Sequence, residues 1–169
     1  MFTPVQLALA ADVLDRCRRS GLRLATAESC TGGLISGCLT AIAGSSAVFD
    51  RGFVTYSNEA KTALLGVPAG LLARTGAVDE QVARAMAEGA LCAAGAGLGV
   101  AVPVVTVAVT GIAGPEGGSR NKPVGLVHFA AARNDAETLH ERHVFTGDRD
   151  AVRAATVEAA LRLLARRLD

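Results

Sequence analysis

The valine-rich stretch at residues 102–110 reads Val-Pro-Val-Val-Thr-Val-Ala-Val-Thr. β-Branched residues favour the extended backbone of a strand, and an apolar run without polar alternation is typical of a strand that is buried on both faces. Such a strand needs a covering layer on each side, because its side chains would otherwise meet water. This stretch therefore predicts the central strand of an α/β sheet.

The segments on either side of this strand alternate in pattern. Apolar residues at helical spacing predict helices, and short runs rich in β-branched and aromatic residues predict strands. The expected strands span residues 22–27, 48–56, 102–110, 124–132 and 138–145, and the expected helices span residues 4–19, 34–41, 58–65, 79–96 and 148–168, with a helical turn or two at 68–73.

Local signals add caps and a turn to this outline. The side chains expected to cap the following helices are those of Thr31, Asn58, Asp79 and Asp148. Asn134-Asp135 predicts a hairpin turn between the last two strands. We therefore expect one domain over residues 1–169, a three-layer α/β/α fold with a mixed sheet of about five strands.

Composition excludes several classes of function. The formal net charge is +1, so no excess of Lys and Arg is available to neutralise a nucleic-acid backbone. No apolar run is long enough for a membrane span, and the first residues do not have the pattern of a signal peptide. We expect a cytoplasmic protein that binds neither nucleic acid nor membrane.

The cysteines predict no metal site. Cys17, Cys30, Cys38 and Cys92 lack Cys-x-x-Cys spacing and form no cluster with histidine, as a zinc site would require. They are better interpreted as small apolar residues in a reducing compartment.

The first glycine-bearing loop, residues 28–33, joins an expected strand to an expected helix. Backbone N–H groups and the dipole at a helix N-terminus attract anions, and Gly32 and Gly33 would let a phosphate approach closely. Ser29 and Thr31 would add hydroxyl donors. The alternative is an ordinary strand–helix turn with a threonine cap.

Two later loops point to the same end of the sheet. Thr110, Gly111 and Gly114 directly follow the central strand, where ligands of open α/β sheets bind. Arg149 begins the last expected helix and could pair with a phosphate or carboxylate. A flexible surface loop and a solvated arginine are the alternatives.

A lysine is the candidate base. Gly-x-Ser-x-Gly is absent, and all three histidines fall in the last two expected strands, so no Ser-His-Asp triad is indicated. Lys61 follows the only tyrosine, Tyr56, and stands in the first turn of a helix, whose dipole lowers the pKa of an amine. Ser46 precedes the same strand as a candidate nucleophile. Ordinary strand, helix and turn positions are the alternatives for these three residues.

Lysine is also rare in this chain. Lys61 and Lys122 are the only lysines among 17 basic residues. Arginine stays protonated in proteins whereas lysine can lose its proton, so a retained lysine is a hint of an ammonium or amine with a function. Chance is the alternative.

Several short motifs resemble the CinA C-terminal family, also known as the nicotinamide-nucleotide amidohydrolases or NMN deamidases. The resemblance extends over about residues 5–167, and the domain is similar to the stand-alone form of the family, without the larger N-terminal domain that often precedes it. The motifs are Thr26–Gly33, Gly44-Ser45-Ser46, Val54–Lys61, Val109–Pro115, Lys122-Pro123-Val124-Gly125 and Gly147-Asp148-Arg149.

The resemblance implies hydrolysis of the carboxamide of nicotinamide mononucleotide to nicotinate mononucleotide and ammonia, in pyridine-nucleotide salvage, without metal or cofactor. By motif, Ser46 matches the nucleophile, and Tyr56 with Lys61 the proton-transfer pair, although Ser29 is an alternative nucleophile. The family's substrate-binding positions correspond to Ser29, Thr31, Gly32, Gly33, Thr110, Gly111, Gly114 and Arg149.

One departure from the family pattern, one alternative function and one expectation about assembly complete this outline. Asp79 replaces the family's usual serine, and its carboxylate could repel a phosphate if it faced the site. A nucleotide-binding or competence-related module without catalysis is the alternative function. An alanine-rich domain of this size often buries a helix face against its own copy, so we also expect a homodimer.

Overall fold

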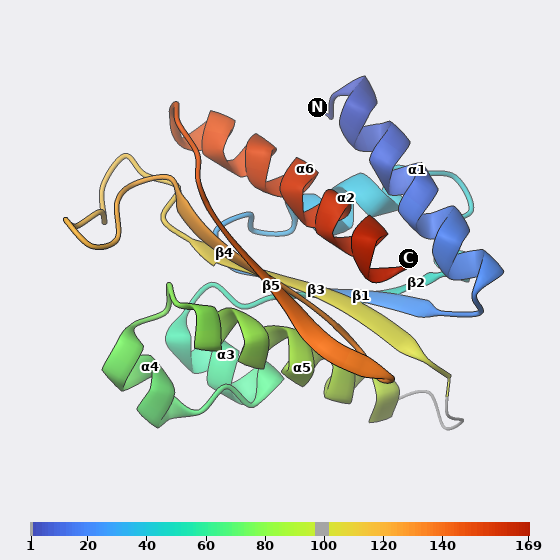
Figure 1. Cartoon of the computed structure of the whole chain (residues 1–169), viewed down its shortest axis with the longest axis horizontal. Coiled ribbons are helices and arrows are strands. Elements are labelled where there is room, and N and C mark those ends of the chain that lie inside the picture. The colour runs from blue at the N-terminus through green and yellow to red at the C-terminus, as the bar shows by residue number, and fades with distance from the viewer. Residues whose placement is uncertain (1, 97–101) are drawn as a thin grey trace.

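The computed structural model describes residues 2–96 and 102–169. The helices are α1 (Pro4–Arg19), α2 (Leu34–Thr40), α3 (Asn58–Leu65), α4 (Ala69–Thr75), α5 (Glu80–Ala96) and α6 (Arg149–Arg167), with a 3-10 turn η1 (Ser45–Ala47) (Figure 1). The strands are β1 (Arg23–Glu28), β2 (Phe49–Val54), β3 (Val104–Gly111), β4 (Leu126–Arg133) and β5 (Ala136–Val144).

The five strands form one mixed sheet in the order β2-β1-β3-β4-β5. β1 pairs in parallel with β2 and β3, whereas β4 runs antiparallel to both β3 and β5. The valine run supplies β3, which is central and buried from Val104 to Thr110. The predicted α/β sheet and its closing hairpin at Asn134-Asp135 are confirmed.

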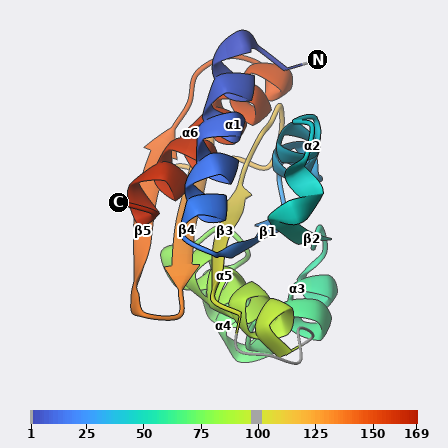
Figure 2. The same cartoon turned by 90° about the vertical axis from the view of Figure 1, so that its right-hand side faces the viewer.

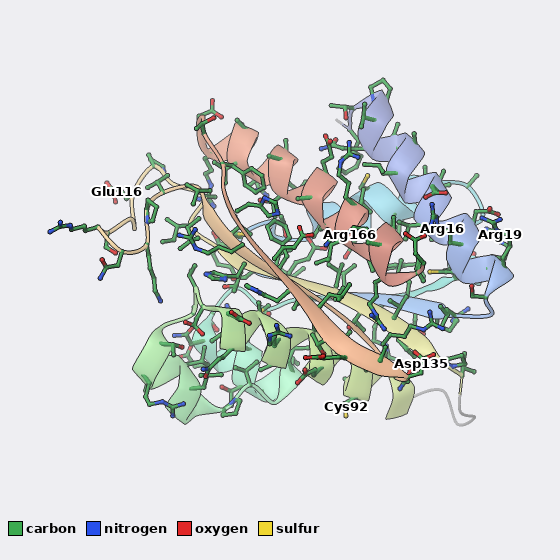
Figure 3. The ribbon with its side chains drawn as sticks, in the orientation of Figure 1. Arg16, Arg19, Cys92, Glu116, Asp135 and Arg166 are labelled. Carbon is green, nitrogen blue, oxygen red and sulfur yellow. The ribbon has the colours of Figure 1, made fainter. Side chains whose placement is uncertain are left out.

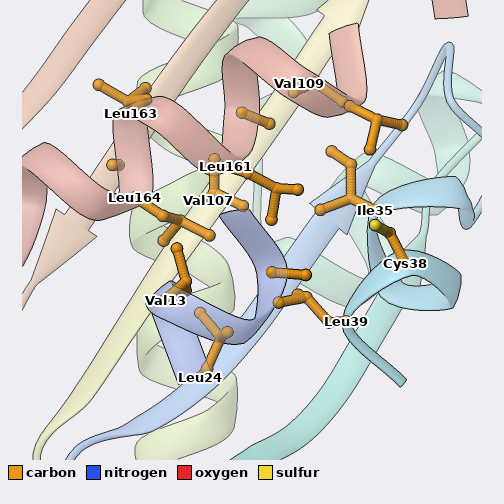
Figure 4. Close-up of a cluster of buried hydrophobic side chains, with 14 of the residues drawn as sticks. Val13, Leu24, Ile35, Cys38, Leu39, Val107, Val109, Leu161, Leu163 and Leu164 are labelled. Atoms are coloured by element: carbon orange, nitrogen blue, oxygen red, sulfur yellow. The ribbon is translucent and has the colours of Figure 1, made fainter. Parts of the chain in front are cut away.

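Helices cover both faces of the sheet and complete the three layers (Figures 1 and 2). Val105, Val107 and Val109 point to the side of α1, α2 and α6, where they join the larger hydrophobic core (Figure 4). Ala108 faces α5 on the other side, together with alanines of β4. The small side chains on this face let α5 approach closely, and the Thr106 hydroxyl donates to the Ala87 carbonyl of α5 at 2.8 Å.

Two of the four predicted caps are confirmed. The carboxylates of Asp79 and Asp148 accept hydrogen bonds from Gln81 N and Ala151 N at the starts of α5 and α6. The other two predictions are wrong by one or two residues. Ser57, not Asn58, caps α3, and Gly33 occupies the cap position of α2 because the Thr31 hydroxyl bonds elsewhere.

Among the described residues, no helix is both long and apolar enough to cross a membrane.

Candidate active site

A cavity of about 220 Å³ opens at the carboxyl ends of β1 and β3, the sheet edge that the sequence predicts for ligands. Four larger hollows lie elsewhere on the described chain, among them one between α1, α6 and β5 and one between α3 and α4, but none is lined by a serine or cysteine beside a base. The residues lining the smaller cavity are Ser29, Cys30, Tyr56, Lys61, Ala77, Val78, Thr110, Gly111, Ala113 and Arg149.

Lys61 is buried at one side of this cavity, with 1% of its surface exposed. Its Nζ lies 3.0 Å from Ser29 Oγ, 2.8 Å from the carbonyl oxygen of Thr55 and 3.5 Å from that of Tyr56. No described carboxylate forms an ion pair with it. Burial without a compensating partner disfavours the ammonium, so the pKa of Lys61 is lowered.

The three contacts satisfy an ammonium, whose three N–H groups can donate to Ser29 Oγ and the two carbonyls, and they also suit the neutral amine that the lowered pKa favours. An uncharged Nζ has two N–H donors, which the carbonyls of Thr55 and Tyr56 accept, and one lone pair, which can accept the Ser29 proton. An ammonium would have to donate to the serine instead. The arrangement can therefore remove a proton from a serine hydroxyl, the activation that a nucleophilic serine needs.

The backbone at Ser29 is fixed by the residue before it. Glu28, fully buried at the end of β1, turns its carboxylate into the N-terminus of α2. Its Oε2 accepts from Thr31 Oγ1 at 2.7 Å, Gly33 N at 3.1 Å and Ile35 N at 3.0 Å. Its Oε1 accepts from the backbone N–H and hydroxyl of Ser36 at 2.8 and 2.7 Å.

The N–H groups at this helix N-terminus are therefore not free to bind a ligand phosphate, and Arg149 is the other position that the sequence offers for it. The anion that the N–H groups hold is the chain's own carboxylate, and Thr31 donates to it rather than to the cavity. Gly32 and Gly33 have φ angles of +61° and +99°, which glycine adopts readily, so the tight turn itself accounts for both. Neither glycine lines the cavity.

The expected meeting of Ser46 with Tyr56 and Lys61 is wrong. Ser46 is exposed in η1, which precedes β2, whereas Tyr56 and Lys61 follow β2. The length of β2, roughly 20 Å for six extended residues, separates the two ends. Because β1 and β2 are parallel, the residue that shares an edge with Lys61 is Ser29, which follows β1.

Tyr56 and Arg149 form the mouth of the cavity. Arg149 Nη2 donates to the Tyr56 hydroxyl at 2.9 Å, and Nη1 donates to the Gly114 carbonyl at 2.8 Å. The Tyr56 phenol therefore points to the arginine, and its contact with Lys61 passes through the main chain only. Both acceptors of Arg149 are neutral, so its charge has no carboxylate partner in the described chain.

The residues of the second glycine loop shape the cavity wall. The Thr110 hydroxyl donates to the Ala77 carbonyl at 2.7 Å and holds residues 77 and 78 over the cavity. A Cβ at Gly111 would lie 2.7 Å from the Leu126 carbonyl, and one at Gly114 would lie 2.6 Å from Val124 Cγ1. Close packing thus accounts for both glycines, of which only Gly111 lines the cavity.

Comparison with known proteins identifies the family of this chain. The model of the CinA C-terminal domain matches residues 6–168. The chain belongs to the CinA C-terminal domain family. Among solved structures, the competence/damage inducible protein CihA of Agrobacterium tumefaciens has a TM-score of 0.90 and 47% identity, covering 98% of this chain and 97% of that one.

Relatives of the CinA C-terminal domain differ in length. The nicotinamide-nucleotide amidohydrolase PncC of Escherichia coli K12 is 49% identical over 94% of this chain and 92% of its own, and that of Enterobacter agglomerans is 52% identical over 86% and 84%. A CinA-like protein of Geobacter metallireducens is 55% identical over 89% of this chain. This chain spans about a third of that longer relative, 35% of its length.

Sequence reasoning missed four cavity residues of the CinA domain. Ala77, Val78 and Ala113 contribute walls through tertiary packing, for which an alanine or valine gives no local signal. Cys30 directly follows Ser29, and this adjacency was the available signal. Burial raises the pKa of the Cys30 thiol to about 12, so it stays protonated and is a poor nucleophile beside the serine.

The remaining polar candidates lie outside the cavity. Asp79 does not line it, and its carboxylate is engaged by Gln81 N, so the departure from the family pattern places no charge in the site. His128 and His140 bond to each other at 3.0 Å on the α5 side of the sheet. Among residues 2–96 and 102–169, no three His, Cys, Asp or Glu side chains gather as a metal site would require.

Proposed function

We propose that the chain hydrolyses the carboxamide of nicotinamide mononucleotide to nicotinate mononucleotide and ammonia, a step of pyridine-nucleotide salvage. The observation that carries the proposal is the buried Lys61 amine 3.0 Å from the Ser29 hydroxyl, inside a cavity. The amidohydrolase relatives that match over most of both chains support the same reaction.

In the first half-reaction, Ser29 Oγ attacks the carboxamide carbon while its proton passes to Lys61 Nζ. The tetrahedral intermediate then breaks its C–N bond, and Lys61 returns the proton to the leaving nitrogen, which departs as ammonia. The product of this half is an ester between Ser29 and the nicotinoyl group. We assign stabilisation of the oxyanion to backbone N–H groups of the loop that follows β3, other than that of Ile112, which already donates to the Leu126 carbonyl.

In the second half-reaction, Lys61 removes a proton from water, and the resulting hydroxide attacks the ester carbon. Collapse of this intermediate breaks the C–O bond to Ser29, whose oxygen recovers the proton from Lys61. The carboxylic acid product and the starting form of the chain result, and the acid then loses its proton to solvent to give the carboxylate. Tyr56 is assigned to the mouth, where it orients Arg149, because its hydroxyl bonds to the guanidinium rather than to the amine.

The direct test is release of ammonia from nicotinamide mononucleotide by the purified chain, with the acid product identified by mass spectrometry. The proposal expects turnover by the wild type and none by Ser29→Ala. Binding of the nucleotide without any ammonia release would reject the reaction and favour the non-catalytic nucleotide-binding alternative.

We further propose that residues 1–169 act as one domain, in the cytoplasm and as a homodimer. The cysteines at 17, 30, 38 and 92 are free thiols, which is the state in which a reducing compartment keeps cysteines. Val54, Tyr56 and Leu64 expose 49%, 62% and 50% of their surface, at the end of the edge strand β2 and in the segment that follows it. Covering them needs a partner surface. Light scattering at micromolar concentration should give twice the mass of the 169-residue chain, and a monomer mass would contradict the assembly.

A further inference from the structure

The proposed substrate carries a phosphate that takes no part in the hydrolysis of its carboxamide. The following inference rests on the proposed function. A phosphate monoester has a charge of roughly −1.5 to −2 at neutral pH. The cavity of about 220 Å³ encloses the amide-cleaving pair, and the N-terminus of α2 is already filled by Glu28. The phosphate therefore needs cations outside the cavity, near its mouth.

Lys122 is a cation beside the cavity wall to which the mechanism gives no role. It belongs to the loop between β3 and β4, and its Nζ donates to the carbonyl of Thr75 at the end of α4. An added Cβ on the next residue, Gly76, would lie 3.9 Å from that Nζ. Gly76 directly precedes Ala77 and Val78, which line the cavity, so the ammonium lies just behind the rim.

The loop between β3 and β4 contains Lys122 and also contacts Arg149. Arg149 donates a hydrogen bond to the carbonyl of Gly114, which lies in the first arm of the loop, the part that directly follows β3. That arm packs against Val124 in the second arm, since a Cβ on Gly114 would lie 2.6 Å from Val124 Cγ1. Lys122 stands two residues before Val124. The two cations are thus held by touching arms of one loop.

Lys122 and Arg149 differ from most of the chain's other cations in the charge of the groups that they contact. The acceptors of Lys122 and Arg149 are backbone carbonyls and a phenol, and neither cation forms an ion pair within residues 2–96 and 102–169. Many of the other arginines, such as Arg16, Arg84 and Arg162, are neutralised by a nearby carboxylate. Two uncompensated positive charges match the charge of one phosphate monoester.

We propose that Lys122 is a specificity-determining residue that binds the substrate's phosphate together with Arg149 and so selects a nucleotide over the corresponding nucleoside. The ammonium leaves the Thr75 carbonyl or shares its remaining protons with the phosphate oxygens. The amide chemistry stays with Ser29 and Lys61, which Lys122 does not contact.

The test compares Lys122→Ala with wild type on nicotinamide mononucleotide and on nicotinamide riboside, which lacks the phosphate. A charged hydrogen bond lost from the phosphate should lower kcat/KM for the nucleotide by about 10- to 100-fold, mainly through KM. Activity on the riboside should not change. Lys122→Arg should keep most of the preference, because it keeps the charge.

Arg120→Ala is the matched control. Arg120 is exposed on the same loop and has no hydrogen bond or ion pair to any described residue, so its loss changes the loop's charge equally. The control should behave as wild type on both substrates. An equal loss in Arg120→Ala and Lys122→Ala would show a diffuse charge effect and overturn the proposal.

A purely structural role of Lys122 predicts a different result. If the bond to Thr75 only holds the cavity wall, Lys122→Ala should lower kcat/KM for nucleotide and riboside by the same factor, which would overturn the proposal. Calorimetry with ribose 5-phosphate gives a readout that needs no turnover. Its Kd should rise about 10-fold or more in Lys122→Ala. An unchanged Kd would reject the phosphate site even if the chain hydrolyses another amide, and a raised Kd would support it even if the amidase proposal failed.

Discussion

The amine of Lys61 and the hydroxyl of Ser29 lie 3.0 Å apart although 31 residues of chain separate them in the sequence. Parallel pairing of β1 and β2 produces this meeting, because Ser29 follows one strand and the segment to Lys61 follows the other. Glu28 fixes the first partner through α2, and the first turn of α3 carries the second. The pair is therefore set by topology rather than by a local motif.

Substitution of the two candidate serines distinguishes their roles. Ser29→Ala should abolish ammonia release and any acyl-enzyme, because the hydroxyl beside Lys61 is gone. Ser46→Ala should stay within about twofold of wild type, since an exposed turn residue at the far end of β2 contacts no substrate. Mass spectrometry of trapped intermediates and steady-state rates provide the measurement. An active Ser29→Ala combined with an inactive Ser46→Ala would reverse the assignment.

The protonation state of Lys61 predicts the pH dependence. Burial lowers its pKa, and the mechanism needs the neutral amine, so kcat/KM should rise with pH through that lowered pKa and then level off. Lys61→Arg keeps the positive charge but accepts no proton near neutral pH, and it should cost at least about 100-fold in kcat. Binding of the nucleotide should change little.

The rate–pH profile of the arginine variant is the control for this assignment. The rising limb should disappear from its residual activity, because the group that titrates is absent. A wild-type profile that falls as pH rises towards the ordinary lysine pKa, or a Lys61→Arg variant with wild-type turnover, would contradict a lysine base.

Much of the fold follows from the sequence because its signals are local. The valine run defines β3, and the capping aspartates at 79 and 148 mark the starts of α5 and α6. The site depends on chain direction and side-chain orientation. Placing Ser46 correctly requires knowing that β1 and β2 are parallel neighbours, and no residue pattern shows that the Glu28 carboxylate turns into α2.

Independence from metal is a separate expectation. The proposed steps use only Ser29, Lys61 and water, so exhaustive chelation should leave kcat and KM within experimental error of the untreated protein. The assay is ammonia release after dialysis against a chelator, with each divalent ion added back singly. A large loss that one ion restores would contradict the lysine–serine mechanism.

The last prediction concerns Glu28, which we expect to support both stability and catalysis. Glu28→Gln replaces one acceptor oxygen by an NH₂ group that faces the N–H donors of α2, so several buried donors lose their partner. Unpaired buried donors are costly, and the free energy of unfolding should fall by at least about 2 kcal/mol. Urea unfolding followed by circular dichroism measures the change.

Glu116→Gln is the control for the loss of one carboxylate. Glu116 is exposed on the loop beyond the end of the sheet, so its change should stay within about 0.5 kcal/mol (Figure 3). In the folded fraction of Glu28→Gln, kcat should fall more than KM rises, because a displaced Ser29 backbone moves the hydroxyl away from Lys61 while the mouth residues remain. If Glu28→Gln unfolds at the wild-type urea concentration, the carboxylate does not hold this loop, and another interaction must fix Ser29.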